Sequence, residues 1–162
     1  MVRPAVPADE AGWTRAWFES AVEGFGPLLP ESHAYPKAPP GRFQELLADP
    51  GVSLLVADED GVVAGFSGCG ENRDADARAE TGELRSMFVA PRSWRRGVGR
   101  ALLAAALDDL REHGYSEVTV WSFAGNERAN AFYEAAGFTR DGAERSEDAW
   151  AHILELRYRR SL

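Results

Sequence analysis

The order of apolar patterns along the chain predicts a mixed domain of the α/β (α+β) class, with helices packed on a central sheet. Segments with helical periodicity alternate with short runs that are typical of strands. No internal repeat or low-complexity tract interrupts this order. A length of 162 residues is typical of one domain, which can bury a core without disulfides or metals. We therefore expect residues 1–162 to form a single domain with one functional site.

The first half of the chain is predicted to contain two helices and a β-hairpin. Amphipathic spacing indicates a helix over residues 9–22 and, after a Gly/Pro-rich stretch over 24–41, a short helix over 41–48. Two apolar runs within residues 53–70 are joined by Asp-Glu-Asp-Gly, whose last step is typical of a hairpin turn. The acidic stretch over 71–83 is expected to be an exposed loop.

The second half is predicted to alternate strands and helices, with breaker residues at the junctions. Pro91 ends one strand, Gly114 suits the position after a helix, and Asn126 suits an N-cap. The expected elements are a strand over 84–89, a helix to about residue 113, a strand over 117–122, a helix over 126–137, and two last strands, from 138 and over 150–158.

Composition excludes several classes of protein. The longest apolar run, over residues 101–107, is far too short to cross a bilayer. The first residues contain no apolar signal segment and Cys69 is the only cysteine, so we expect a cytoplasmic protein without disulfides. The three histidines, His33, His113 and His152, are scattered and show no metal-ligand spacing, so no metal is expected.

Charge is unevenly distributed along the chain. The formal net charge of −8 argues against general nucleic-acid binding, which needs a basic face, and suits a cationic substrate. Yet residues 84–107 contain five arginines and no carboxylate, around a loop with Gly97 and Gly99 before a helix. The free N–H groups and dipole of that helix end predict an anion site, best suited to a polyphosphate. The alternative is a tight glycine turn with arginines that solvate a helix end.

Two motifs narrow the choice of polyphosphate. Dinucleotide and P-loop patterns are not matched, because a third glycine and a Gly-Lys-Ser/Thr step are missing. The first motif reads Trp94-Arg95-Arg96-Gly97-Val98-Gly99, and the second has Asn126, Ala129, Phe132, Tyr133, Gly137 and Phe138 at its fixed positions. Together they resemble the GNAT superfamily of N-acetyltransferases, which transfer an acyl group from acyl-coenzyme A to an amine. Trp94 stands where that family's loop signature has Arg or Gln, so this side-chain contact is not carried over.

The resemblance implies a fold and a coenzyme site. The implied fold is a central mixed, mostly antiparallel sheet of about six or seven strands flanked by about four helices. Residues 82–138 would form the coenzyme A-binding core, with acceptor-side elements over 1–50 and 139–162. The implied acetyl-coenzyme A contacts are Met87, Phe88, Val89, Arg95, Arg96, Gly97, Val98, Gly99, Arg100, Ala101, Asn126, Ala129, Phe132 and Tyr133.

The resemblance also implies direct attack of the amine on the thioester, so Cys69 is not needed as a nucleophile and is expected to pack in a strand. Tyr133 would donate a proton to the leaving thiolate, although its helical spacing also fits a core stripe. Glu83 would accept the proton of the amine; a solvated strand-end carboxylate, His33 or a water chain are the alternatives. A backbone N–H near Met87 would stabilise the oxyanion.

The identity of the amine decides how much a base is needed. Holding a lysine-like amine neutral at pH 7 costs about 4.6 kcal/mol, and an α-amino group only about 1 kcal/mol. A small-molecule amine is the preferred acceptor, with a peptide or protein N-terminus or a lysine as the second choice. A domain that senses acyl-coenzyme A without turnover is the third. No nucleic-acid or membrane partner is expected.

Acceptor selection is expected from the N-terminal helices, the stretch over 24–41 and the last hairpin. Glu31, His33 and Tyr35 are polar candidates there, with ordinary loop residues as the alternative. An exposed edge at the last strand leaves open a homodimer.

Overall fold

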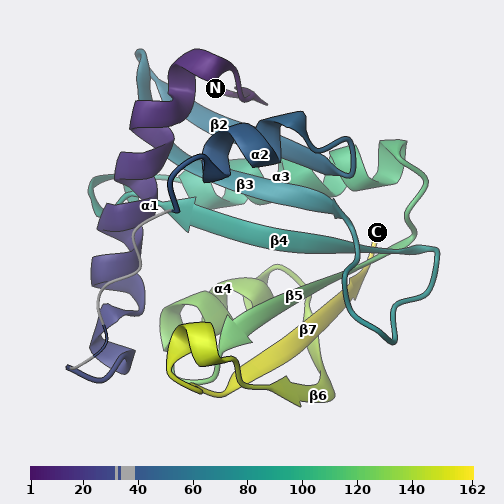
Figure 1. The fold of residues 1–162 in the computed structure, drawn as a ribbon. Helices are drawn as coiled ribbons and strands as arrows, with labels where there is room; N and C mark the ends of the chain where they lie inside the picture. The colour runs from purple at the N-terminus through teal and green to yellow at the C-terminus, as the bar shows by residue number, and fades with distance from the viewer. Residues whose placement is uncertain (32, 34–38) are drawn as a thin grey trace.

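Seven strands form one central sheet within residues 1–31, 33 and 39–162, which a computed structural model describes (Figure 1). The strands are β1 (Val2–Pro4), β2 (Val52–Glu59), β3 (Val62–Glu71), β4 (Thr81–Val89), β5 (Glu117–Phe123), β6 (Thr139–Arg145) and β7 (Glu155–Ser161). They lie in the order β1-β2-β3-β4-β5-β7-β6, and only β4 and β5 run parallel among these adjacent pairs. The predicted mixed, mostly antiparallel sheet is confirmed.

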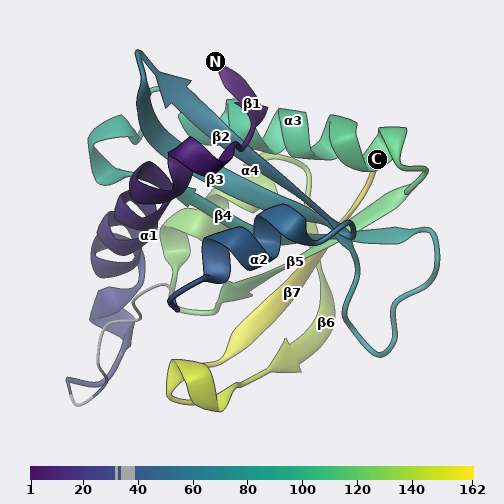
Figure 2. The same cartoon turned by 45° about the horizontal axis from the view of Figure 1, so that its top comes forward.

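Four α-helices of the described chain cover the sheet. They are α1 (Glu10–Gly24), α2 (Arg42–Ala48), α3 (Val98–Glu112) and α4 (Glu127–Ala135). Helices α1 and α2 lie on one face and α3 and α4 on the other (Figure 2). Neighbouring residues of β2 point to opposite faces of the sheet. Val56 packs with Trp13 and Phe43 on the face of α1 and α2, and Ala57 packs with Leu102 of α3 on the other face. None of these described helices is both long enough and apolar enough to span a bilayer.

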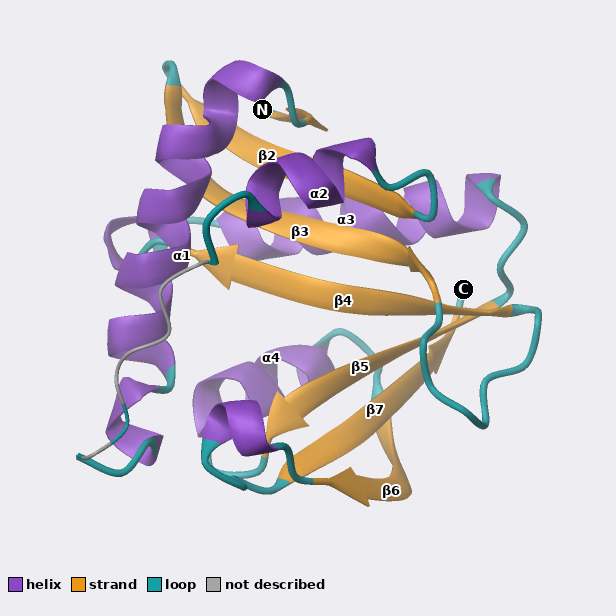
Figure 3. Ribbon diagram, viewed as in Figure 1, coloured by secondary structure: helices purple, strands orange, loops and turns teal. Residues whose placement is uncertain are grey.

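The parallel strands β4 and β5 are paired only where they begin. Residues 81–83 of β4 pair with residues 117–119 of β5, and past Glu83 no described residue continues this ladder (Figure 3). Gly82 allows the close approach of α3 at this point, because a Cβ there would lie 2.7 Å from Leu110 Cδ2. From residue 84 to 89, β4 pairs with β3 alone. Over these residues, the edge of β4 that faces β5 therefore has no strand partner.

The start of β4 differs from the prediction. The loop expected over 71–83 ends at residue 80, because residues 81–83 belong to the strand. Thr81 and Glu83 are each 2% exposed. Thr81, Gly82 and Glu83 lack the apolar pattern of a buried strand. They can be buried because their polar groups are satisfied by hydrogen bonds to other segments of the chain. Asn72 supplies one such contact, donating from Nδ2 to the Gly82 carbonyl at 3.1 Å.

The ends of the sheet also differ from the prediction. The last strand spans Glu155–Ser161 and not residues 150–158, because residues 148–150 form a helical turn with Trp150 packed on Phe25 and Phe123. This strand lies between β5 and β6, so the exposed edge predicted for it belongs to β6. A dimer formed through that edge would use β6. Strand β1 was not predicted, and it is only three residues long.

Candidate active site

Two cavities lie along the unpaired edge of β4. One, of about 680 Å³, lies among the end of β4, the loop before α3 and the start of α4; we call it the arginine cavity. The other, of about 480 Å³, is lined by both β4 and β5; we call it the mixed-charge cavity. The two cavities share six of their lining residues, which are Phe25, Met87, Phe88, Asn126, Ala129 and Tyr133. The cavities are therefore two arms of one cleft.

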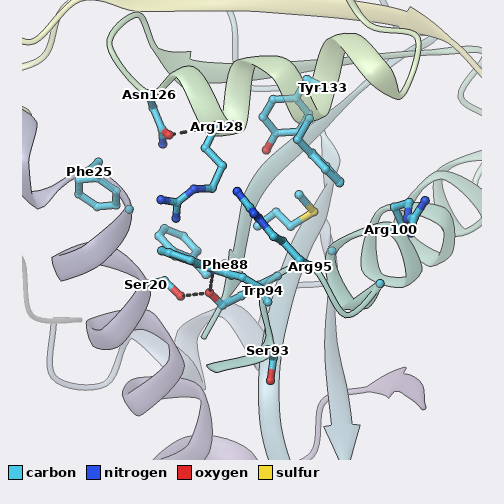
Figure 4. A pocket seen from close by; sticks show the side chains of 17 residues that line it. Ser20, Phe25, Phe88, Ser93, Trp94, Arg95, Arg100, Asn126, Arg128 and Tyr133 are labelled. Carbon is cyan, nitrogen blue, oxygen red and sulfur yellow. Dashed lines mark hydrogen bonds between the residues drawn. The ribbon is translucent and has the colours of Figure 1, made fainter. Parts of the chain in front are cut away.

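The arginine cavity is the electropositive arm. Arg95 and Arg128 point into it, and Arg100 also lines it (Figure 4). The described lining residues include no Asp or Glu, in a chain whose formal net charge is −8. Two helix N-termini border the cavity, at the N-caps Gly97 of α3 and Asn126 of α4. Guanidinium groups and helix N-termini both favour anions, so this arm suits a ligand with several negative charges.

The loop before α3 has a special backbone. Gly97 has φ of +89°, a conformation that favours glycine, and a Cβ there would meet no atom within 4 Å, so the cavity wall is open at the start of α3. A Cβ at Gly99 would already lie 3.5 Å from the Phe132 ring. Arg95 is held at φ of +60°, which is costly for a residue with a side chain. The strained residue lies in the cavity wall, where strained conformations often have a functional reason.

Most residues predicted to contact the coenzyme line the arginine cavity: Met87, Phe88, Val89, Arg95, Gly97, Gly99, Arg100, Asn126, Ala129, Phe132 and Tyr133. Three others do not line it. Arg96 lies 3.8 Å from Glu59 on the β2–β3 hairpin, Val98 packs beside Leu102, and Ala101 is exposed on α3. The carboxylate of the hairpin draws the Arg96 side chain away from the cavity.

Tyr133 lies where the two arms meet. It is 5% exposed, and its ring packs edge to face on Phe132 and Phe138 at centroid distances of 5.5 and 5.6 Å. Within the described part of the chain its hydroxyl has no hydrogen-bond partner. Burial raises the pKa of that hydroxyl well above its ordinary value. The group therefore keeps its proton at neutral pH, and the ring packs in the core while the residue lines both arms of the cleft.

Glu83 lies where β4 and β5 separate, and it lines the mixed-charge cavity. Its carboxylate accepts three hydrogen bonds from Arg73, from Nε at 2.9 Å, Nη2 at 2.7 Å and the backbone N–H at 3.2 Å. With 2% exposure, Glu83 is not the solvated strand-end carboxylate that was the alternative. Arg73 therefore contacts both carboxylate oxygens of Glu83 and fixes their orientation.

The mixed-charge cavity is lined by aromatic rings and by paired charges. Trp17 of α1 and Phe88 of β4 stack with centroids 4.9 Å apart. Glu155 is 5% exposed and accepts a hydrogen bond from Arg145 Nε at 2.8 Å. The charged residues that line the mixed-charge cavity are Arg42, Arg73, Arg85, Arg145, Asp74, Glu83, Glu147 and Glu155. Since the two signs balance, this arm suits a polar molecule better than a polyanion.

A comparison with known protein families agrees with this geometry. The family model described as the acetyltransferase (GNAT) family matches residues 14–138, which is most of the chain. The chain belongs to the GNAT family. It is 36% identical over 120 residues to a mycothiol acetyltransferase from Clavibacter sepedonicus, an alignment that covers 74% of this chain and 34% of that protein. The chain thus spans about a third of the length of this relative.

Solved N-acetyltransferase structures share the fold over the full length of the chain. One is a PaiA N-acetyltransferase from Thermoplasma acidophilum in complex with coenzyme A, with a TM-score of 0.79, 16% identity, and coverage of 100% of this chain and 98% of that one. Another is a ribosomal-protein-alanine N-acetyltransferase from Brucella melitensis, with a TM-score of 0.78, 22% identity, and coverage of 100% and 99%. At these identities the likeness shows the fold alone.

The residues proposed from sequence for acceptor selection are not found in the GNAT cleft. Glu31 and His33 line neither cavity, and Tyr35 lies outside the described residues. The mixed-charge cavity takes only part of its wall from the two predicted acceptor-side segments, and more of its lining residues lie within 82–138. Trp17 comes from the first segment and Trp150 from the last.

The cleft residues that were missed from the sequence include Arg128 and Arg73. Arg128 is the second residue of α4, where the helix dipole disfavours a cation, and this unfavourable placement was a usable signal. Arg73 gave no signal, because it lies in a segment expected to be an exposed loop. The hydrogen bonds from Arg73 to Glu83 form because the chain turns back between β3 and β4, and no local sequence pattern predicts that contact.

Proposed function

We propose that this GNAT chain transfers the acetyl group of acetyl-coenzyme A to a primary amine of a small molecule, by direct attack in a ternary complex. The observation that carries the proposal is the joined cleft, with an electropositive arm and a charge-balanced arm that meet at Tyr133. The first arm would hold the coenzyme and the second the amine. Residues 82–138 would supply most of the coenzyme site, with acceptor contacts from 1–50 and 139–162.

The arginine cavity fits coenzyme A in charge and size. Its volume of about 680 Å³ lies within the usual range for ligand pockets. The phosphates would be held by Arg95, Arg100 and the amides beside Gly97, and the pantetheine arm would lie along the unpaired edge of β4. The PaiA relative was solved in complex with coenzyme A.

When bound, acetyl-coenzyme A supplies an acetyl group already activated as a thioester, so the chain needs no nucleophile of its own. Cys69 supports this view. It is fully buried, and burial raises the pKa of its thiol to about 12, so little thiolate exists at neutral pH. Its thiol lies 3.7 Å from the Ala106 carbonyl of α3, and the residue lines neither cavity.

Three groups of the chain would carry the chemistry. The Tyr133 hydroxyl would donate a proton to the departing sulfur, and a backbone N–H of β4 near Met87 would bind the carbonyl oxygen as negative charge develops. Glu83 would accept the proton of the amine. The meeting of the two arms beside Met87 and Tyr133 supports this arrangement.

A small acceptor is supported by the second arm, whose volume is about 480 Å³. Its buried carboxylates Glu83 and Glu155 are each paired with an arginine, which does not favour an acidic groove for a cationic peptide. The relative from Clavibacter sepedonicus is named for mycothiol, a small molecule. A peptide N-terminus, a protein lysine, or binding without turnover would be outcomes of the test.

The test is thiol release from acetyl-coenzyme A with a panel of polyamines, aminoglycosides, amino acids and short peptides, with the product identified by mass. We expect turnover with a small amine. Glu83→Gln should lower turnover most for the amines of highest pKa, because their deprotonation costs most. Turnover of Glu83→Gln equal to the unmodified chain at every pH would remove Glu83 from the mechanism.

The control is Arg111→Gln, an exposed change on α3 outside both cavities, which should leave turnover unaltered. Release with peptides alone would overturn the small-molecule assignment. Tight binding of acetyl-coenzyme A without release for any amine would instead support a sensing domain.

A further inference from the structure

Trp94 and Arg128 form a stacked pair in the wall of the arginine cavity (Figure 4). The guanidinium carbon of Arg128 lies 3.7 Å from the centroid of the Trp94 ring. The ring is itself fixed, because its Nε1 donates to the Val89 carbonyl at 2.7 Å. Ser20 of α1 donates to the same carbonyl at 2.7 Å. Trp94 thus offers Arg128 a rigid aromatic face anchored to the end of β4.

The charge of Arg128 is not neutralised by the protein. Within the described residues, no carboxylate pairs with it. Two other arginines of the loop region, Arg92 and Arg96, are paired with Glu19 and Glu59 respectively. Arg95 and Arg100, which also line the cavity, likewise have no carboxylate partner among the described residues, so three guanidinium groups there are left to bind an anion.

The position of Arg128 is also unfavourable for the helix that carries it. It is the second residue of α4, directly after Glu127, and the positive end of the helix dipole repels a cation there. The stack on Trp94 offsets part of this repulsion. A bound anion would offset more of it, because the anion would interact with both the guanidinium and the helix end.

We propose that Arg128, held on the face of Trp94, binds a phosphate group of coenzyme A and supplies the side-chain cation that the loop lacks at position 94. The inference rests on the proposed coenzyme site and not on the identity of the amine. The loop carries Trp94 where the GNAT signature has Arg or Gln, and a cation reaches the same cavity from α4. Trp94 is then a positioning residue, because it acts through Arg128.

The test is the dissociation constant of coenzyme A, measured by calorimetry without any amine. Arg128→Gln should weaken binding about 10-fold, as expected for loss of one hydrogen bond to a charged group. It should also reduce the dependence of binding on salt concentration, because one cation–phosphate contact is gone. Trp94→Leu should weaken binding while the charge stays, because Arg128 loses its support. Arg111→Gln, which removes an exposed arginine outside the cavity, should bind as tightly as the unmodified chain.

Two further measurements make the result specific to Arg128 and to one phosphate of coenzyme A. Trp94→Arg in the Arg128→Gln background should recover part of the lost affinity, because it returns a cation to the loop. With dephospho-coenzyme A, an unchanged effect of Arg128→Gln would assign Arg128 to the pyrophosphate, and a lost effect would assign it to the 3′-phosphate. Equal affinity of Arg128→Gln and the unmodified chain would overturn the proposal for Arg128 alone. No binding by the unmodified chain would overturn the coenzyme site as well.

Discussion

Tyr133 has its ring in the core and lines both arms of the cleft. The ring is fixed by its aromatic neighbours, so the hydroxyl is held in place without a hydrogen bond to the described part of the chain. Burial raises the pKa of the hydroxyl, and so the group is a proton donor across the neutral range and well into alkaline pH.

Tyr133→Phe tests this role. The change removes the hydroxyl and keeps the ring, so we expect kcat to fall by about 100-fold or more, the usual contribution of a positioned general acid. The affinity for coenzyme A and the thermal midpoint should change little, because no hydrogen bond of the described residues is lost. Steady-state kinetics, calorimetry and thermal unfolding measure the three quantities. A kcat within a few-fold of the unmodified enzyme would exclude Tyr133 as the donor.

At the scale of elements, several side chains tie the loop over residues 72–80 to the sheet, and Arg157 pairs with two of the loop's carboxylates. Arg157 of β7, with a side chain 6% exposed, pairs with Asp74 at 3.0 Å, Asp76 at 2.7 Å and Asp141 of β6 at 2.7 Å. The same loop carries Arg73, which holds Glu83. The loop that carries Arg73 is therefore fixed in part by a residue of a different strand.

This tether should be sensitive to acid. The hydrogen bond from Arg157 lowers the pKa of Asp76 from 3.8 to about 2. A depressed pKa means that the folded state holds the ionised form more strongly than the unfolded state does. The stabilisation is therefore complete above about pH 4 and is lost as the pH falls through about 2.

Asp76→Asn checks the tether by denaturant unfolding at several pH values. The variant should be less stable than the unmodified chain at neutral pH, and the difference should shrink between about pH 4 and about pH 2. Exposure of Asp76 limits the size of the effect, because solvent screens the pair. A stability difference that does not vary with pH would assign the effect to packing and not to charge.

Elements with a local signal could be predicted from the sequence, and elements held by distant contacts could not. Helix α3 and the β2–β3 hairpin have clear periodicity, and the hairpin turn at Asp60 and Gly61 has the positive φ angles that its Asp-Gly step predicts. In contrast, β1 is three residues long and depends on Arg3, which pairs with Asp9 and Asp58. Such contacts leave no periodic pattern.

The residues of the candidate site also divide into those with a local sequence motif and those placed by distant contacts. The loop around Gly97 and the helix with Tyr133 are local motifs, so their place in the cleft could be expected. Arg73 could not be found, because its role depends on the turn of the chain between β3 and β4. The Arg96 side chain was expected to contact the coenzyme, but it lines neither cavity and lies 3.8 Å from Glu59 of the β2–β3 hairpin.

At the scale of the whole molecule, the separation of β4 from β5 creates the cleft. Pairing stops after Glu83, and each arm then uses a different set of neighbours beside the unpaired edge of β4. The chain is strongly acidic, yet one arm has no acidic residue in its described lining. This separation of charge would direct an anionic coenzyme to one arm and leave the charge-balanced arm for the amine.

The central claim is that both substrates occupy this one cleft and that the acetyl group passes directly between them. A single-turnover experiment tests it most directly. Enzyme in excess is mixed with acetyl-coenzyme A labelled in the acetyl group, with and without the best amine of the panel, and label is followed on protein and amine. We predict that label appears on the amine only when both substrates are present, and never on the protein. A labelled protein that forms without amine, and then passes its label to the amine, would contradict direct transfer.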